Sequence, residues 1–467
     1  MNNAHAHHRG TPAAIGARLD RLPESGRVWR LVALLSLGGF FETYDLGLTA
    51  TLPPGLIQAG LFHDSAKGVL GLSDQAAFAV ATFAGLFLGT AGLGRIADRF
   101  GRRAVFTLSL LWYAAGSLMM AVQNGAAAID FWRFVTGIGI GLELVTIDSF
   151  ITELVPGASR GKAFAFNQCL QLTAIPLAGL LSWLVMPETV LGVAGWRWVT
   201  IVPAIGALFV WWIRRELPES PRWLAAQGRF EAADGVVTSL EAHIEADIGE
   251  KLPDWHAGPP APVEAMDLRE IFRGSLRKST LMLITLNIFQ AIGFYGFNTW
   301  LPTLLASRGV SFVNSLGYST VIAVMFPVAP LIFIGIADKM ERKWLIVSAS
   351  VAIAVFGLIF SQQTDPVALI ILGTLITASA ILLSFSYHAY QSELYPTRIR
   401  SRAVGFVYSF GRLAIVFGSV AISALLKSHG ALSVFIFIAG CMVIVALVVG
   451  LLGPDTRGKS LDEIDAG

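Results

Sequence analysis

Long apolar stretches, separated by short polar segments, fill most of the 467-residue chain. Each stretch is near the roughly 20 residues that an α-helix needs to cross a bilayer. The pattern therefore predicts an all-α membrane protein with about twelve transmembrane helices, six in each half. The expected spans are about 30–52, 76–97, 104–124, 127–151, 163–186 and 197–213, followed by about 280–303, 316–337, 344–361, 366–391, 403–426 and 431–453.

The polar segments divide the chain into five parts. These are an N-terminal tail over 1–29, a first six-helix bundle over 30–213, a linker over 214–278, a second bundle over 279–453, and a C-terminal tail over 454–467. The linker has helix-forming composition in its first part and is Pro-rich later, so we expect short amphipathic helices there. The histidines of the first tail, His5, His7 and His8, are expected in a solvated, disordered segment.

Two short motifs occur twice, and each copy lies 240 residues after the first. The repeated charged residues are Asp98, Arg102, Glu153 and Arg160 in the first half, and Asp338, Arg342, Glu393 and Arg400 in the second. A shared offset for two separate motifs predicts that the two halves are copies of one duplicated unit.

Composition agrees with a membrane protein, because mean hydropathy is +0.64 and only 14% of residues are charged. Most of the 34 Lys and Arg residues fall in segments that lie on the same side as an inner N-terminus, so both termini are expected in the cytoplasm. The net charge of +2 indicates no nucleic-acid partner. The sequence contains no Gly-rich phosphate loop, nucleophile elbow or metal-ligand spacing, so we expect neither an enzyme nor a cofactor.

Charged residues inside predicted spans are costly and mark functional sites. Asp45 lies about 22 Å from the inner edge of the first span, and Arg133 about 9 Å from the outer edge of the fourth, at 1.5 Å per residue. In a hydrocarbon core about 30 Å thick these depths coincide, so the two can pair. Protonation of Asp45 would then release Arg133, which suits proton coupling, whereas the alternative is a permanent salt bridge. Glu42, one turn before Asp45, is a further candidate for this role, and Glu143 and Asp148 are secondary relay candidates.

Arg412 lies about 15 Å deep in the eleventh span by the same helical rise. It has no acid nearby on its own helix, so its partner is expected from another helix or from a ligand. A guanidinium binds a carboxylate through two hydrogen bonds, which favours an anionic substrate. The alternative is a structural hydrogen bond between helices. Polar and aromatic residues at a similar depth predict a pocket for a small planar ligand, although they also suit helix packing: Gln290, Tyr295, Asn298, Trp300, Tyr387 and His388.

The segment Gly94-Arg95-Ile96-Ala97-Asp98-Arg99-Phe100-Gly101-Arg102-Arg103 resembles the loop motif of the major facilitator superfamily. Pro218-Glu219-Ser220-Pro221-Arg222 and Pro454-Asp455-Thr456-Arg457-Gly458 resemble sugar-porter signatures, and Phe166-Asn167-Gln168 matches the same subgroup. The resemblance implies two pseudo-symmetric six-helix bundles that work by alternating access. It also implies proton coupling through Asp45 and Arg133, and a substrate contact at Gln168. A cytoplasmic gate that latches the two halves would contain Asp98, Arg102, Asp338, Arg342, Glu153, Arg160, Glu393, Arg400 and Arg222.

The doubled Gln of sugar porters is missing from the seventh span, which reads Phe289-Gln290-Ala291-Ile292-Gly293. The following Phe-Tyr-Gly-Phe-Asn-Thr-Trp-Leu-Pro string and the Gly411-Arg412 step look more like bacterial nicotinate transporters, aromatic-acid/proton symporters and organic-ion carriers. We therefore expect a proton-coupled importer of a small aromatic carboxylate such as nicotinate, acting as a monomer in the inner membrane. The alternatives are a proton-coupled sugar or polyol porter and an organic-cation/proton antiporter, which would need an acidic midplane in the second half.

Overall fold

A computed structural model describes residues 11–63, 72–92, 96, 99–156, 159–255, 267–337, 340–395 and 399–455. In these ranges the chain is helical except for loops and one short antiparallel hairpin, in which β1 (Thr189–Val190) pairs with β2 (Val193–Ala194). The histidines of the N-terminal tail lie outside the described residues.

The first half contains six spans. They are α3 (Gly26–Gln58), α4 (Asp74–Phe87) with the π-turn η2 (Leu88–Gly92), α6 (Arg102–Ala121), α7 (Ala126–Leu154), α8 (Arg160–Val185), and α9 (Gly195–Ile201) joined to α10 (Ile205–Glu216) by the 3₁₀ turn η4 (Val202–Ala204). The sixth span is interrupted where Pro203 occupies η4, because a proline offers no backbone N–H to a regular helix.

The second half repeats this arrangement. Its spans are α13 (Gly274–Ala306), α14 (Phe312–Ala323) with α15 (Met325–Ala337), α16 (Arg342–Gln362), α17 (Pro366–Glu393), α18 (Arg400–His429) and α19 (Ala431–Leu452). Ten spans in the described ranges are long and apolar enough to cross a membrane, and the interrupted second and sixth spans complete the twelve. The prediction of a twelve-helix membrane protein is confirmed.

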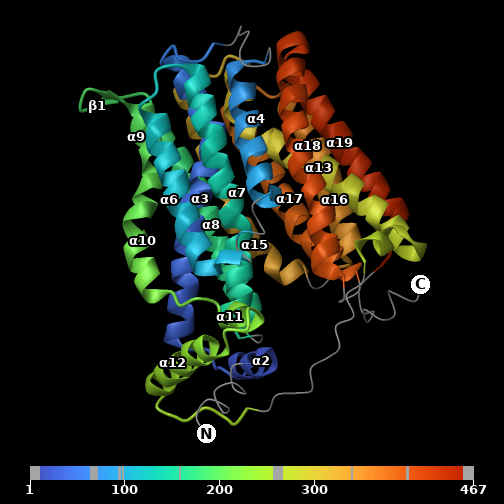
Figure 1. Cartoon of the computed structure of the whole chain (residues 1–467). Coiled ribbons are helices and arrows are strands. Elements are labelled where there is room, and N and C mark those ends of the chain that lie inside the picture. Colours follow the sequence, from blue (N-terminus) through green and yellow to red (C-terminus); the bar gives the residue numbers. More distant parts are fainter. Residues whose placement is uncertain are drawn as a thin grey trace.

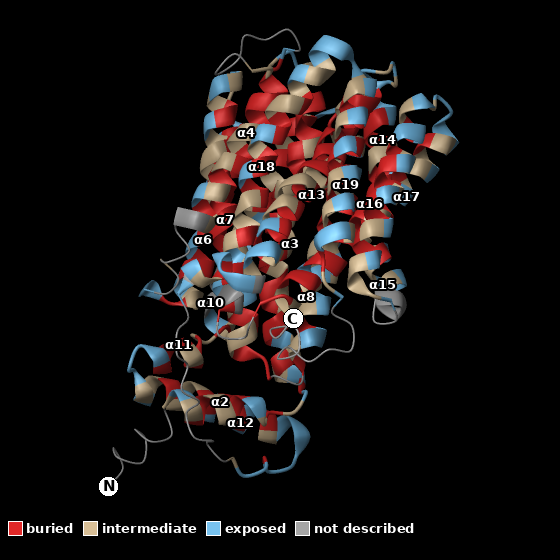
Figure 2. Ribbon diagram, turned by 90° about the vertical axis from the view of Figure 1, so that its right-hand side faces the viewer, coloured by how far each residue is buried: buried red, intermediate tan, exposed pale blue. Residues whose placement is uncertain are grey.

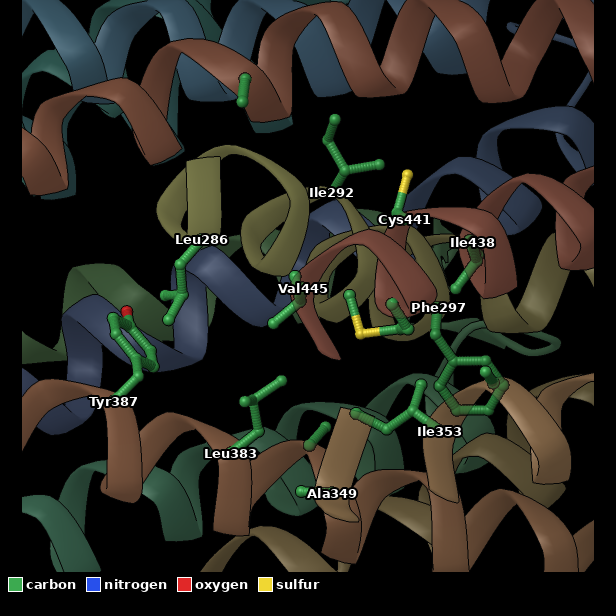
Figure 3. Close-up of a cluster of buried hydrophobic side chains, with 14 of the residues drawn as sticks. Leu286, Ile292, Phe297, Ala349, Ile353, Leu383, Tyr387, Ile438, Cys441 and Val445 are labelled. Carbon is green, nitrogen blue, oxygen red and sulfur yellow. The ribbon is translucent and has the colours of Figure 1, made fainter. Parts of the chain in front are cut away.

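The two halves form separate bundles that lie side by side, blue to green and yellow to red in Figure 1. Each bundle has its own apolar core; that of the second half joins α13, α16, α17 and α19 around residues such as Leu286, Phe297, Ile353 and Val445 (Figure 3). Many residues on the outward faces of the bundles are exposed (Figure 2). The exposed residues include large apolar ones such as Phe417 and Leu208. An apolar exterior of this kind suits contact with lipid.

A layer of short helices covers one end of the first bundle (Figure 1). It contains α2 (Pro12–Asp20), α11 (Pro221–Ala226) and α12 (Phe230–Ile248), while the 3₁₀ turn η5 (Leu268–Phe272) precedes α13. We call this end the inner face, because the distribution of Lys and Arg predicts that it is cytoplasmic.

Helix α2 was not predicted, and the side chain of Arg18 explains how it is held. Arg18 has no exposed surface, and its guanidinium donates hydrogen bonds to Asp234 at 2.5 Å, Thr238 at 2.9 Å and Glu241 at 2.6 Å, all on α12. Ala14, Ile15 and Leu19 are also buried. Nine residues are too few to show a helical period clearly, so the tertiary contacts rather than the local pattern determine this helix.

Candidate transport site

A cavity of about 590 Å³ lies between the two bundles and is lined by both. The first bundle contributes α3, α4, α7 and α8, and the second contributes α13, α14, α15, α17 and α18. The volume lies in the range of sites for small molecules. The lining includes eight residues that were predicted from the sequence: Glu42, Gln168, Gln290, Tyr295, Asn298, Tyr387, His388 and Arg412.

Trp300 does not line the cavity, so its position does not support the prediction that it contacts the substrate. Its side chain is 2% exposed and belongs to the apolar core of the second bundle. Asn298 faces the cavity, and a residue two positions later on a helix points about 200° around the axis. Trp300 was predicted from its depth in the membrane alone, whereas the face of the helix on which a residue lies decides whether it reaches the cavity.

Arg412 reaches the cavity from α18 with two phenolic partners. Its Nη1 donates to the Tyr295 hydroxyl at 3.1 Å, and its Nη2 donates to the Tyr408 hydroxyl at 2.6 Å. The guanidinium carbon also lies 4.9 Å from the centre of the Tyr408 ring. Tyr408 lies one turn earlier on the same helix, so the expectation that the partner must come from elsewhere is only half right. The expectation considered acids alone, and it overlooked a hydroxyl at position i−4.

The guanidinium of Arg412 keeps unused binding capacity. The side chain is 7% exposed, and its Nε is buried without a hydrogen-bond partner among the described residues. Both hydroxyl partners are neutral acceptors, so the hydrogen bonds do not neutralise the positive charge. A buried cation whose hydrogen-bonded partners are neutral can be compensated by an anionic ligand.

Asp45 and Arg133 form the ion pair that their depths predicted. Arg133 Nη1 lies 2.6 Å from Asp45 Oδ1, and both side chains are fully buried. Arg133 also donates to the Asp45 carbonyl oxygen at 2.8 Å, to Thr49 at 2.7 Å and to Thr82 at 2.8 Å. Ser117 donates to the other Asp45 oxygen at 3.2 Å. The pairing is thus confirmed, and the pair lies behind the cavity wall rather than in its lining.

Glu42 and Asp148 bring acidic groups to the cavity from the first bundle. Glu42 lines the cavity yet is only 2% exposed, and its Oε2 lacks a hydrogen-bond partner within the described ranges. Asp148 lines the cavity on α7. Asp148 was only a secondary candidate from the sequence, because a helical position alone does not show whether a side chain points to the cavity or to lipid.

The bundles meet at their outer ends. Gln75 at the start of α4 donates to Thr303 near the end of α13 at 2.7 Å, and Ser73 bonds Ser423 of α18 at 2.7 Å. At the opposite end, the cavity lining continues along α8 to Gly161. The two bundles are therefore hydrogen-bonded to each other at their outer ends, while the cavity lining extends toward the inner face.

The inner-face ion pairs of the two repeated motifs lie within single bundles. Arg102 Nη2 lies 3.0 Å from Glu153, and the repeat-related Arg342 Nε lies 2.6 Å from Glu393. The two pairs are related by the sequence repeat, but each joins residues of one bundle, so neither pair connects the two bundles in this conformation. Asp98, Asp338 and the side chain of Arg400 lie outside the described residues.

Arg160 and Arg222 meet α2 rather than the second bundle. Asp20, the last residue of α2, lies 3.0 Å from Arg222 and 3.9 Å from Arg160. Both arginines were predicted in the gate, and their described ion pairs join α2 to α8 of the same half and, within the inner-face layer, to α11.

Glu219 has a capping role that was not predicted from the sequence. Its Oε1 accepts from the backbone N–H groups of Arg102 at 2.9 Å and Arg103 at 3.1 Å, at the start of α6. The carboxylate thereby satisfies N–H groups that have no partner within the helix and favourably meets the helix dipole. Gly101 leads into this turn with φ of 97°, and a Cβ there would lie 2.3 Å from Glu219. The positive φ and the tight contact both require glycine.

Two six-helix bundles related by a repeat, with a cavity between them, are the architecture of a membrane transporter with a central substrate site. The sequence comparison agrees with this class. The profile of the family described as sugar (and other) transporter matches residues 31–467. The chain belongs to this family of the major facilitator superfamily, and it is a membrane transporter rather than an enzyme.

Relatives and solved structures span nearly the whole chain. A putative metabolite transport protein, YyaJ of Bacillus subtilis, is 32% identical over 95% of this chain and 96% of its own length. The niacin transporter NiaP of Acinetobacter baylyi is 24% identical over 96% of this chain and 99% of its own length. The xylose transporter XylE from E. coli superimposes with a TM-score of 0.71 at 20% identity, covering 94% of this chain and 99% of that structure. The last likeness bears on the fold alone.

Proposed function

We propose that the protein is a proton-coupled importer of a small aromatic carboxylate, with nicotinate as the leading candidate, and that it acts as a monomer in the inner membrane. The observation that carries this proposal is the guanidinium of Arg412, which faces the cavity and is hydrogen-bonded to two neutral phenols. A carboxylate would neutralise this charge and could accept hydrogen bonds from it. Among the substrate classes considered, an anion answers this need directly.

The cavity walls suit the planar part of such a ligand. Phe294 lines the cavity with its ring centre 5.1 Å from that of Tyr295 and 6.1 Å from that of Phe326, each in edge-to-face geometry. Aromatic walls with a few polar groups bind flat ligands by contact area and fix their orientation by hydrogen bonds. Gln290 and Asn298 from α13 and His388 from α17 would supply those polar groups. The niacin transporter among the relatives supports the same substrate class.

Coupling to protons would run through Asp45 and Arg133. While Asp45 is ionised, the pair and the three further hydrogen bonds of Arg133 join α3, α4 and α7. Protonation of Asp45 would remove the counter-charge and allow Arg133 to separate, so the bundle could change shape. The halves 30–213 and 279–453 would then rock about the cavity, with the linker and both tails on the cytoplasmic side. The repeated pairs Arg102–Glu153 and Arg342–Glu393, together with the Asp98 and Asp338 loops, would form the cytoplasmic gate.

A neutral sugar or polyol porter is the second candidate. Gln168 and Gln290 both line the cavity, and amide side chains are suited to hydroxyl groups. In that case Arg412 would have a structural role through its tyrosines. Loss of Arg412 would then leave ligand affinity nearly unchanged, whereas loss of either Gln would abolish binding.

Binding to the purified transporter distinguishes these candidates. The wild type, Arg412→Ala and Gln290→Ala would be titrated with nicotinate, xylose and tetraethylammonium, with a thermal shift and calorimetry as readouts. We expect nicotinate to stabilise the wild type and to bind Arg412→Ala about 100-fold more weakly, because two charge-assisted hydrogen bonds contribute about 3 kcal/mol or more. Stabilisation by xylose alone would refute the carboxylate assignment. Stabilisation by tetraethylammonium alone would favour an organic-cation carrier instead.

A further inference from the structure

Three polar atoms lie buried where α3, α6 and α7 meet, and within the described residues none has a hydrogen-bond partner. They are Glu42 Oε2, Glu143 Oε1 and the hydroxyl oxygen of Tyr113. The side chains of Glu143 and Tyr113 have no exposed surface, and Glu42 is 2% exposed. Buried polar groups in proteins nearly always have partners, so three unpartnered groups in one region indicate a missing bound species.

The two carboxyl groups approach the same face of α3. Gly38 lies one turn before Glu42, and a Cβ placed on Gly38 would be 2.9 Å from Glu143 Oε1. The carboxyl of Glu143 therefore reaches α3 directly beside the turn that carries Glu42. Its second oxygen faces Ser109 of α6 at the long distance of 3.4 Å. Tyr113 lies one further turn along α6 on the same side, where the charges of both glutamates act on its hydroxyl.

The charges around Glu42 are mostly negative. Glu143 and Asp148 lie on α7, Asp148 and Arg412 of α18 line the same cavity as Glu42, and Asp45 lies three residues after Glu42 on α3. Arg412 is the positive member of this set, and its hydrogen bonds go to tyrosines rather than to Glu42. Asp45 is separately neutralised by Arg133. Two ionised carboxylates at close range without a cation bonded to either would be strongly disfavoured in this buried region.

Resting on the proposed function, we infer that Glu42 and Glu143, with the hydroxyl of Tyr113, form a second proton-binding site, separate from Asp45 and Arg133, which holds one proton between the two carboxyl groups and binds it more tightly when a carboxylate occupies Arg412. In this step an O–H bond forms on a glutamate oxygen, and the proton comes from hydronium in the water of the cavity. The protonated carboxyl then donates to the other carboxylate, and the hydroxyl of Tyr113, which has no partner among the described residues, turns to donate to the remaining oxygen.

The link to substrate follows from the position of Arg412. Arg412 and Glu42 line the same cavity, and a positive charge near a carboxyl group favours the ionised carboxylate. An anionic ligand on Arg412 would cancel that influence, leaving Glu42 with the repulsion of Glu143 and Asp148. Ligand binding would then favour protonation of Glu42, and by linkage a proton at Glu42 would favour binding of the ligand.

Infrared spectra of the wild type and its variants, recorded without any substrate and subtracted from each other, test the site. The signal is the C=O stretching band of protonated carboxyl groups in the purified full-length protein at neutral pH. We expect the double variant Glu42→Gln/Glu143→Gln to lose an intense band that Asp45→Asn retains. Tyr113→Phe should keep this band but shift its frequency, because the hydroxyl no longer donates to the carboxyl pair. This conservative variant tests the assignment even if the double variant does not fold.

A band that survives in the double variant, or that keeps its frequency in Tyr113→Phe, would overturn the proposal. The same infrared band would also be recorded after choline chloride is replaced by sodium chloride. This control is needed because two carboxylates, with the hydroxyls of Ser109 and Tyr113, could also bind Na⁺. Loss of the band on addition of Na⁺ would assign the site to that cation and overturn the proton assignment.

Proton uptake on ligand binding tests the link to substrate. Nicotinate would be added to weakly buffered protein containing a pH indicator. At a pH where the infrared band has half its full intensity, wild type and Asp45→Asn should each take up protons when nicotinate binds, and the double variant should take up none. Equal uptake by wild type and the double variant would refute the link. If nicotinate does not bind at all, the proposed substrate fails, while the infrared measurement still decides whether the proton site exists.

Discussion

Replacement of Asp45 by Asn removes one charge from a site in which both partners are fully buried. Arg133 would lose its 2.6 Å contact with the carboxylate and retain hydrogen bonds to the Asp45 carbonyl, Thr49 and Thr82. Breaking a buried ion pair by removing one partner typically costs about 3–5 kcal/mol. Since three neutral acceptors remain, we expect a cost near the lower end, about 3 kcal/mol. The variant should therefore fold with a lower thermal midpoint.

The transport defect should be larger than the stability defect. Each coupled proton contributes about 1.4 kcal/mol per pH unit, so a gradient of about two units supports about 100-fold accumulation of a substrate that moves with one proton. The amide introduced by Asp45→Asn resembles a protonated carboxyl group and leaves Arg133 without its counter-charge in every state. We therefore expect this variant to exchange substrate across the proteoliposome membrane at a substantial rate. Its internal substrate concentration should only reach the external one, whatever the pH gradient.

The assay compares counterflow with gradient-driven uptake of labelled nicotinate in the same proteoliposomes. Asp130→Asn is a matched control, because Asp130 is also buried on α7 but lies three residues before Arg133 and is not among the acceptors of that arginine described above. The control should accumulate substrate as the wild type does. Full gradient-driven accumulation by Asp45→Asn would show that this pair is structural and would refute the coupling assignment.

Further predictions concern the inner face and the packing of the first bundle. Arg18→Ala should weaken the docking of α2 by about 3 kcal/mol, seen as faster amide hydrogen exchange in α2 but not in α19. Burial raises the pKa of Glu241, but hydrogen bonds and charges from Arg18 and Arg21 outweigh burial, so the pKa lies below 4.5. The docking of α2 should therefore be fully present above about pH 4.5 and should be lost as the pH falls through this lowered pKa. The same hydrogen-exchange measurement checks it. Glu219→Ala should lower stability by about 1 kcal/mol through loss of the cap on α6, measured as the thermal midpoint. Gly85→Ala should cost about 1–3 kcal/mol, because the new Cβ would lie 2.3 Å from a carbonyl oxygen of α7, whereas Gly440→Ala, which meets no atom within 4 Å, should be neutral.

The spans and the buried ion pair were predictable because one-dimensional rules govern them. Hydropathy over about 20 residues is sufficient to place a membrane helix. A constant rise per residue then converts sequence position into depth, so Asp45 and Arg133 could be matched before their helices were known to touch. Depth has this predictive value because a bilayer gives all spans a common axis. In a soluble protein the same argument would not apply.

Helix rotation and side-chain partners were less predictable. Trp300 and Asn298 have nearly the same depth, but of the two residues Asn298 alone faces the cavity. The tyrosine partners of Arg412 were missed because only acids were considered. The capping of α6 by Glu219 joins residues far apart in sequence, and no local pattern records that contact. These features depend on how helices turn toward one another, which the hydropathy of a single sequence does not fix.

The positions of Glu42 and Asp45 on α3 explain how one helix can serve two proton sites. Asp45 follows Glu42 by three positions, so their directions differ by about 60° around the helix axis. That rotation is enough to place Glu42 in the cavity lining and Asp45 behind it, against Arg133 of α7. A bound anion can therefore alter the charge balance at Glu42 directly. It can affect Asp45 only if the bundle itself changes shape, because Arg133 already neutralises Asp45. Sensing of the substrate and release of the ion pair would then be separate events, so a variant that blocks the first should still allow the second.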